Sequence, residues 1–140
     1  MASLAVMTAV AARVAANWSY TTIIDPNETA AVPTDNSAFL EILYPVTTET
    51  PLSFGATGNN AHEELGGFRI CLYIPIGTEI NPTATPWMTR IETLMALFRG
   101  VRFSSIDCIG FVGPTIQDDS DDGAYFEISF AVSYRYIKFG

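Results

Sequence analysis

Residues 125–139 read YFEISFAVSYRYIKF, and this stretch decides the fold class of the chain. Its apolar side chains alternate with polar or small ones, and a period of two residues is typical of a strand that buries one face. The apolar positions are Phe126, Ile128, Phe130, Val132, Tyr134 and Tyr136, and the opposing positions are Glu127, Ser129, Ala131, Ser133 and Arg135. The sequence therefore predicts a long strand over 125–139 that packs on one side.

The sequence before this strand predicts a C-terminal hairpin. Residues 101–112 read as one or two strand pieces, interrupted at Ser104-Ser105 and at Gly110. Residues 117–123, QDDSDDG, combine four mutually repelling aspartates with a glycine that tolerates a positive φ. This composition favours an exposed hairpin tip.

The first half of the chain predicts three more strands and one long loop. Residues 18–24 are aromatic and β-branched and stop at the turn sequence DPN, residues 38–44 stop at a proline, and residues 68–76 alternate with a period of two. Between the last two strands, residues 53–67 read SFGATGNNAHEELGG. Four glycines and several polar groups predict a long, flexible, exposed loop there.

Two segments have helical spacing. The first segment ends at Asn17 and is expected to form a helix with one apolar stripe. Arg13 is expected to point away from this stripe, which holds Leu4, Met7, Val10 and Val14. The second begins after Thr85-Pro86, a cap followed by a first-turn proline, and stops before Gly100. Its buried face is expected to hold Trp87, Ile91, Leu94, Met95 and Phe98.

Together these segments predict an α+β fold in a single domain over residues 1–140. An antiparallel or mixed sheet is packed on one face by the N-terminal and central helices, with a long flexible loop and a C-terminal hairpin. The length of 140 residues suits one core.

Charge and cysteine content exclude several classes of function. Seven Lys and Arg against fifteen Asp and Glu give a net charge of −8, which disfavours nucleic-acid binding. Cys71 and Cys108 lie in apolar runs without a CxxC pair, so neither a disulfide framework nor a zinc site is expected, and a reduced compartment fits. No apolar run is long enough to span a bilayer, and the Ala-rich start lacks the basic residues of a secretory signal.

The acidic hairpin tip is the strongest candidate for a metal site. Asp118, Ser120, Asp122 and Gly123 match the first half of a calcium-binding loop. The match fails at its end, where Ser129 replaces the bidentate glutamate and a strand replaces the helix. We therefore expect a solvated tip and no metal.

No catalytic or cofactor site is expected either. The single histidine, His62, stands in the predicted loop with no nucleophile placed beside it by a motif. The glycine pairs lack the lysine and hydroxyl residue of a phosphate-binding loop. A very apolar sheet beside a long polar loop instead suits a subunit that packs against copies of itself, since an arm that reaches a neighbour can close a ring.

The order of these signals resembles the tail terminator proteins of long-tailed, lambda-like bacteriophages. The segments that carry the resemblance are Trp18 through the DPN turn, Phe39-Leu40-Glu41-Ile42, Gly66-Gly67-Phe68-Arg69, Ile74-Pro75-Ile76-Gly77, the helix from Trp87 to Phe98 and the strand from Tyr125. The resemblance covers nearly the whole chain. Family members often carry a longer helical lead-in than Met1 to Asn17, which leaves the packing of the first helix open.

The resemblance implies a structural subunit of the virion, assembled in the host cytoplasm. It implies a homohexameric ring on the head-proximal end of the tail tube, which stops tube polymerisation and joins the tail to a head-completion or neck protein. DNA would pass through the ring without specific binding, and the negative charge would oppose its adhesion. Enzyme activity, cofactors and membrane contacts are not expected.

The predicted loop is expected to contact a neighbouring subunit or the tail tube, and the acidic tip a basic partner. The candidate interface residues are His62, Glu63, Glu64, Arg69, Asp118, Asp119, Asp121 and Asp122. Alternatives stay open: another neck, connector or tail tube ring subunit, a small acidic protein that binds a metal or ligand, or an adaptor that binds a basic host protein.

Overall fold

A computed structural model describes residues 3–24, 37–45, 47–55, 58, 60–75, 87–117 and 125–139 of the chain. Two helices and seven strands lie in these ranges. They are α1 (Leu4–Asn17), β1 (Thr22–Ile24), β2 (Phe39–Leu43), β3 (Thr47–Pro51), β4 (Ala61–Pro75), α2 (Trp87–Ala96), β5 (Arg102–Phe103), β6 (Ile106–Gln117) and β7 (Tyr125–Phe139). The predicted α+β class, with an N-terminal and a central helix, is confirmed.

All seven strands form one mixed sheet with the order β1-β2-β4-β7-β6-β5, and β3 also pairs with β4. Its centre is the antiparallel pair β4 and β7, which runs for fifteen residues from Ala61 opposite Phe139 to Pro75 opposite Tyr125. β2 pairs with the C-terminal half of β4 and β3 with its N-terminal half. The one parallel pair among the described strands is β1 with β2.

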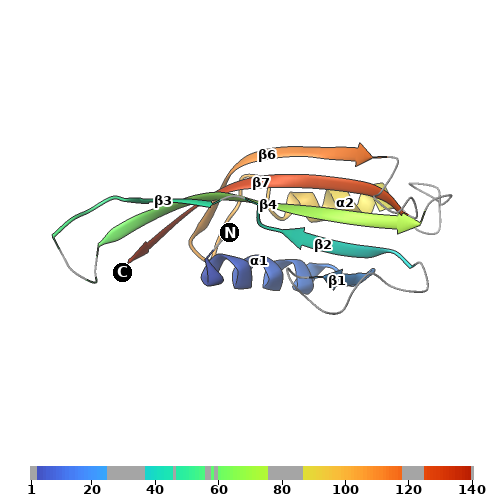
Figure 1. Cartoon of the computed structure of the whole chain (residues 1–140). Helices are drawn as coiled ribbons and strands as arrows, with labels where there is room; N and C mark the ends of the chain where they lie inside the picture. The colour runs from blue at the N-terminus through green and yellow to red at the C-terminus, as the bar shows by residue number, and fades with distance from the viewer. Residues whose placement is uncertain are drawn as a thin grey trace.

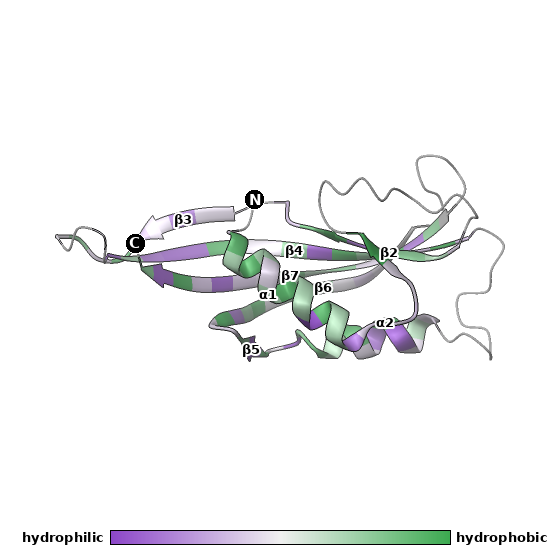
Figure 2. Ribbon diagram, turned by 90° about the horizontal axis from the view of Figure 1, so that it is seen from below, coloured by the Kyte–Doolittle hydropathy of each residue, from purple (hydrophilic) through white to green (hydrophobic). Residues whose placement is uncertain are grey.

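Both helices lie on one face of the sheet, as Figure 1 and Figure 2 show. α2 and the turn after it bury all five predicted side chains, from Trp87 to Phe98. The ring of Phe98 lies edge-on to that of Phe68, with centroids 5.1 Å apart, and 6.5 Å from that of Phe130. The alternation predicted for β7 is confirmed, because its even-numbered residues from Ile128 to Tyr134 face this core and are buried.

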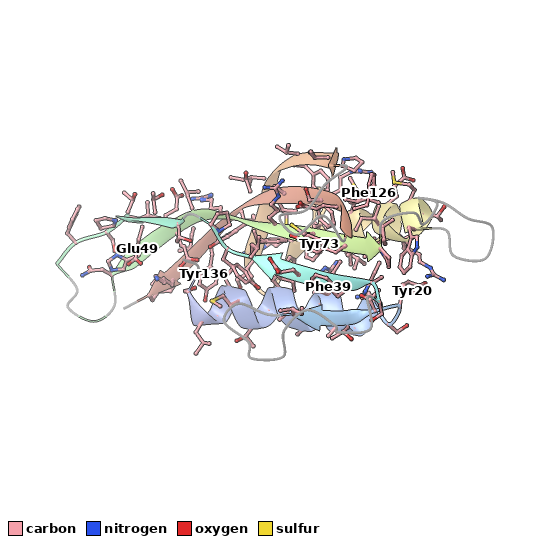
Figure 3. The ribbon with its side chains drawn as sticks, turned by 45° about the vertical axis from the view of Figure 1, so that its right-hand side comes forward. Tyr20, Phe39, Glu49, Tyr73, Phe126 and Tyr136 are labelled. Atoms are coloured by element: carbon pink, nitrogen blue, oxygen red, sulfur yellow. The ribbon has the colours of Figure 1, made fainter. Side chains whose placement is uncertain are left out.

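No described helix or strand packs against the opposite face of the sheet. We call it the helix-free face; it carries the odd-numbered residues of β4 and β7, which alternate with the core positions. At one end of it the rings of Phe39 and Tyr73 stack with centroids 4.7 Å apart (Figure 3). Nearer the centre this face is formed by small or polar residues.

α1 packs differently from the predicted stripe. Val6, Val10 and Val14 are fully buried, whereas Leu4 is 79% exposed. A spacing of four residues throughout keeps the three valines in one row along the helix, and this row faces the sheet. The expectation that Arg13 turns away was wrong. Its Nε donates to the carbonyl oxygen of Leu97 at 3.0 Å, at the end of α2, where carbonyl groups lack helical partners.

The predicted loop over 53–67 was also wrong over residues 61–67, nearly half of its length. Residues 61–67 begin β4, and β3, which the sequence analysis missed, pairs with them from Thr47 opposite Gly66 to Pro51 opposite His62. Only residues 52–60 connect the two strands, and their glycines Gly55 and Gly58 have φ of +91° and +81°. Polar strands form here because their side chains pair across the ladder.

The hairpin of β3 and β4 forms a projection together with the end of β7. We define the arm as β3, the described residues of 52–60, residues 61–65 of β4 and residues 135–139 of β7. In Figure 1 it extends past the beginning of α1, away from both helices. The β4 and β7 ladder runs from the core into the arm without a register shift.

β5 and β6 confirm the predicted interruptions. Ser104 and Ser105 have φ of 47° and 65° and make the two-residue turn between these strands. The register of β6 against β7 shifts between Cys108 and Gly110, and again between Val112 and Thr115. β6 and β7 pair up to Gln117 opposite Glu127, in line with the predicted C-terminal hairpin, whose tip lies outside the described residues.

Candidate functional site: the arm and the helix-free face

The predicted interface residues occupy three places. His62, Glu63 and Glu64 lie on β4 in the arm, and Arg69 lies further along the same strand. Because successive strand residues point to opposite faces, Glu63 and Arg69 lie on the helix-free face, while His62 and Glu64 lie on the other. The four aspartates, Asp118, Asp119, Asp121 and Asp122, fall outside the described residues.

Glu64 is buried at the base of the arm, with 1% of its surface exposed. Its Oε2 accepts hydrogen bonds from the hydroxyl of Tyr134 at 2.7 Å and from the backbone N–H of Ser3 at 3.3 Å, and its Oε1 lies 3.4 Å from Nζ of Lys138. Burial raises the pKa of Glu64, but these hydrogen bonds and the charge of Lys138 outweigh it and lower the pKa below 4.5. An ionised carboxylate therefore joins the beginning of α1 to the arm.

Glu63 and His62 each pair with another residue of the arm. Oε2 of Glu63 accepts from Nε of Arg135 at 2.5 Å. Glu49 on β3 (Figure 3) lies 2.8 Å from Nζ of Lys138 and 3.7 Å from Nδ1 of His62. These contacts join the arm's three strands, and the hypothesis that the same residues contact a neighbour stays a prediction.

The arm also carries exposed apolar side chains, which the sequence analysis did not single out. Five of the ten large apolar side chains exposed on the described residues lie on it: Leu52, Phe54, Leu65, Ile137 and Phe139. Phe54 near the tip and Phe139 at the end of β7 are 83% and 73% exposed. Leu52, Phe54 and Leu65 lie in or next to the predicted loop, and Ile137 and Phe139 end the predicted strand over 125–139.

The helix-free face is hollowed where β4 and β7 carry small residues. Gly67 lies opposite Ser133, and Ala131 lies opposite Arg69, so two adjacent positions lack bulky side chains. A groove of about 330 Å³ lies over them. Its lining includes Pro45, Gly67, Arg69, Val112, Ala131 and Ser133.

Arg69 at this groove differs from the other cationic residues. A guanidinium nitrogen of Arg69 donates to Oγ of Ser129 at 3.0 Å. The other six Lys and Arg side chains each lie against a carboxylate or an aromatic ring. Within the described ranges, Arg69 has neither kind of partner.

Metal ligation and thiol chemistry depend on how the His, Cys, Asp and Glu side chains of the described part of the chain are placed. No group of three His, Cys, Asp or Glu side chains there is placed to hold a metal ion. Cys71 and Cys108 are free and buried, and burial raises their pKa values to about 12 and about 11. Such thiols stay protonated and unreactive at neutral pH.

Among the described residues, no helix is long and apolar enough to cross a membrane. The sequence matches no protein family profile and no curated protein.

Proposed function

We propose that this protein is a structural ring subunit of the tail terminator kind, which closes the head-proximal end of a phage tail tube by assembly and not by catalysis. The observation that carries the proposal is the arm: three strands that project past the helices and expose five large apolar side chains. Large apolar side chains on a projecting element are candidates for contact with other chains.

The placement of the arm supports a ring. The arm projects from one end of the sheet, and the groove lies further along the sheet, over Gly67 and Ala131. A contact between two different surfaces of identical chains repeats head to tail, and it closes into a ring when its rotation closes. Six copies are the number that the resemblance to tail terminators implies.

The charge of the chain supports a ring through which DNA moves. A net charge of −8 gives the assembled ring a negative field, which repels phosphates. The partners in this proposal are copies of the chain, the tail tube protein and a head-completion or neck protein. The ring would form in the host cytoplasm and remain in the virion.

The test measures the mass of the assembled protein and asks whether the protein stops the growth of tail tubes. Purified full-length protein is examined by light scattering and electron microscopy, alone and with the tail tube protein of its own phage. We expect closed six-fold rings and tubes whose growth stops when the protein is added. Open tubes of this protein alone would instead indicate a tube subunit. A monomer at every concentration that leaves tube growth unchanged would refute the proposal.

A further inference from the structure

The groove on the helix-free face is lined by Arg69, which has neither a carboxylate nor an aromatic ring beside it among the described residues. We infer that this groove is a binding site for a small organic acid, whose single carboxylate pairs with Arg69 and whose apolar part lies over Gly67 and Ala131. The inference goes beyond the proposed function and does not rest on it.

The guanidinium of Arg69 has most of its hydrogen-bonding capacity unused. It carries five N–H donors in one plane, and one of its terminal nitrogens donates to Oγ of Ser129 at 3.0 Å. Ser129 is fully buried, so this hydrogen bond holds the guanidinium against β7 beside the groove. No other residue that the structure describes accepts a hydrogen bond from Arg69 or forms an ion pair with it. The remaining donors are therefore available to a ligand.

The lining of the groove, as the described residues form it, contains no acidic side chain. Beside Arg69, its polar side chains are the hydroxyls of Thr115, Ser129 and Ser133. The whole chain has fifteen Asp and Glu against seven Lys and Arg. A groove with a cation and without a carboxylate therefore differs from the average surface of this protein.

The carboxylates closest to Arg69 in the sheet ladder do not neutralise it. Glu41 and Glu127 lie opposite Cys71 and Tyr73, further along β4. Burial and the charge of Glu127 raise the pKa of Glu41. A guanidinium in contact with Glu41 would lower that pKa instead. The positive charge of Arg69 is therefore left for a ligand of the groove.

A carboxylate is the anion that fits this arrangement. The planar guanidinium matches the two oxygens of a carboxylate in a bidentate pair. One positive charge balances one carboxylate, whereas a phosphate dianion would keep a negative charge in excess in a chain of net charge −8. The same net charge opposes unspecific binding of anions, so a carboxylate that binds here is held by the groove itself.

The size and surface of the groove favour a small ligand with an apolar part. Its volume of about 330 Å³ lies at the lower end of the range of small-molecule sites. Pro45, Val112 and Ala131 add apolar side chains to the lining, and Gly67 adds none. A segment of another protein needs a much larger contact, on the order of 800 Å² on each partner. The groove therefore suits an organic acid of a few carbon atoms.

Ligand-observed saturation-transfer NMR on the full-length protein tests the site, with hexanoate as the probe in about 0.15 M salt. We expect saturable binding with a dissociation constant of about 1–10 mM, because a ligand of this size makes few contacts. Hexanol has the same chain without the charge. It should bind at least about 10-fold more weakly, because it cannot form the charge-assisted hydrogen bonds to Arg69.

Variants of the groove locate the binding. Arg69→Gln removes the charge and should weaken hexanoate binding at least about 10-fold while hexanol binding stays the same. Ala131→Leu fills the groove and should weaken the binding of both ligands. The matched control Arg102→Gln removes an exposed cation that pairs with Asp107 outside the groove, and it should bind hexanoate as the wild type does. Circular dichroism and thermal unfolding check that every variant folds.

Four results would overturn the inference. The first is hexanoate that shows no saturable binding up to about 50 mM or binds Arg69→Gln as it binds the wild type. The second is equal binding of hexanoate and hexanol, which would indicate an apolar hollow without an anion site. The third is tighter binding of hexyl phosphate, which would indicate a phosphate site. The fourth is tighter binding of a blocked tripeptide with one glutamate between two valines, which would make an acidic protein segment the occupant.

Discussion

Replacing Glu64 with Gln tests the account of the base of the arm. The substitution keeps the size of the side chain but removes the charge that Tyr134, Ser3 and Lys138 surround. Hydrogen bonds to a charged group contribute about 1.5–3 kcal/mol, and Gln retains part of this network. We expect Glu64→Gln to lower the free energy of unfolding by about 2 kcal/mol at pH 7.

The pH dependence gives a second signature. Because the pKa of Glu64 in the folded chain lies below 4.5, its usual value, the ionised carboxylate stabilises the fold above that pH, and this stabilisation is lost as the pH falls through the folded pKa. The gap between wild type and Glu64→Gln should therefore shrink below pH 4.5. In the matched control Glu49→Gln, an exposed ion pair is lost, and the change should stay below about 1 kcal/mol.

The assay is urea unfolding followed by tryptophan fluorescence at several pH values between 3 and 7. All other carboxylates are common to both proteins, so their titration cancels in the difference. A gap that is the same at pH 3 and pH 7, or a Glu64→Gln protein as stable as the wild type at pH 7, would refute the reasoning.

Three further predictions concern the core, α1 and the cysteines. Leu72→Ala, at a fully buried position, should lower the free energy of unfolding in urea by about 2–5 kcal/mol, whereas Leu52→Ala on the arm should change it by less than about 0.5 kcal/mol. Arg13→Gln should lower it by about 1 kcal/mol, because the hydrogen bond to the carbonyl of Leu97 is lost; an unchanged urea midpoint would contradict that contact. Cys71 and Cys108 should resist thiol reagents at pH 8 until the chain unfolds, and rapid labelling of the native protein would contradict their burial.

Elements with their own local signals were predictable. β7 was visible because its core residues recur every second position, and α2 because Thr85-Pro86 and Gly100 mark its limits. Gly100 has the positive φ, 63°, that such an end requires. In these segments the local pattern and the tertiary packing favour the same structure, so a reading of the sequence alone succeeds.

The arm was missed because its stability is not local. Residues 61–65 have the composition of a loop. In the folded chain Glu63 contacts Arg135 and Glu64 contacts Tyr134, and these partners are 72 and 70 residues away along the chain. The same holds for the groove. Gly67 and Ala131 belong to no motif in the sequence. They form a hollow because the register of β4 on β7 places them at adjacent positions of the sheet.

Arg13 shows a different limit. A lone arginine among alanines and valines is most simply placed in solvent, and the periodicity of the helix gave no reason to do otherwise. Its contact needs the end of α2 and the ring of Phe103, which lies 4.9 Å from its guanidinium carbon. A long side chain can place its charged group away from the helix face on which its Cα lies. Helical spacing alone therefore does not predict the position of that charge.

The unbroken pairing of β4 with β7 has a geometric consequence. A ladder of fifteen residue pairs runs from the core into the arm without a register shift, so the pairing of the arm continues the pairing of the interior. The direction of the arm follows from the right-handed twist of the two central strands, β4 and β7. The direction in which the arm presents Phe139 and Glu63 is therefore set by the geometry of this one pair of strands.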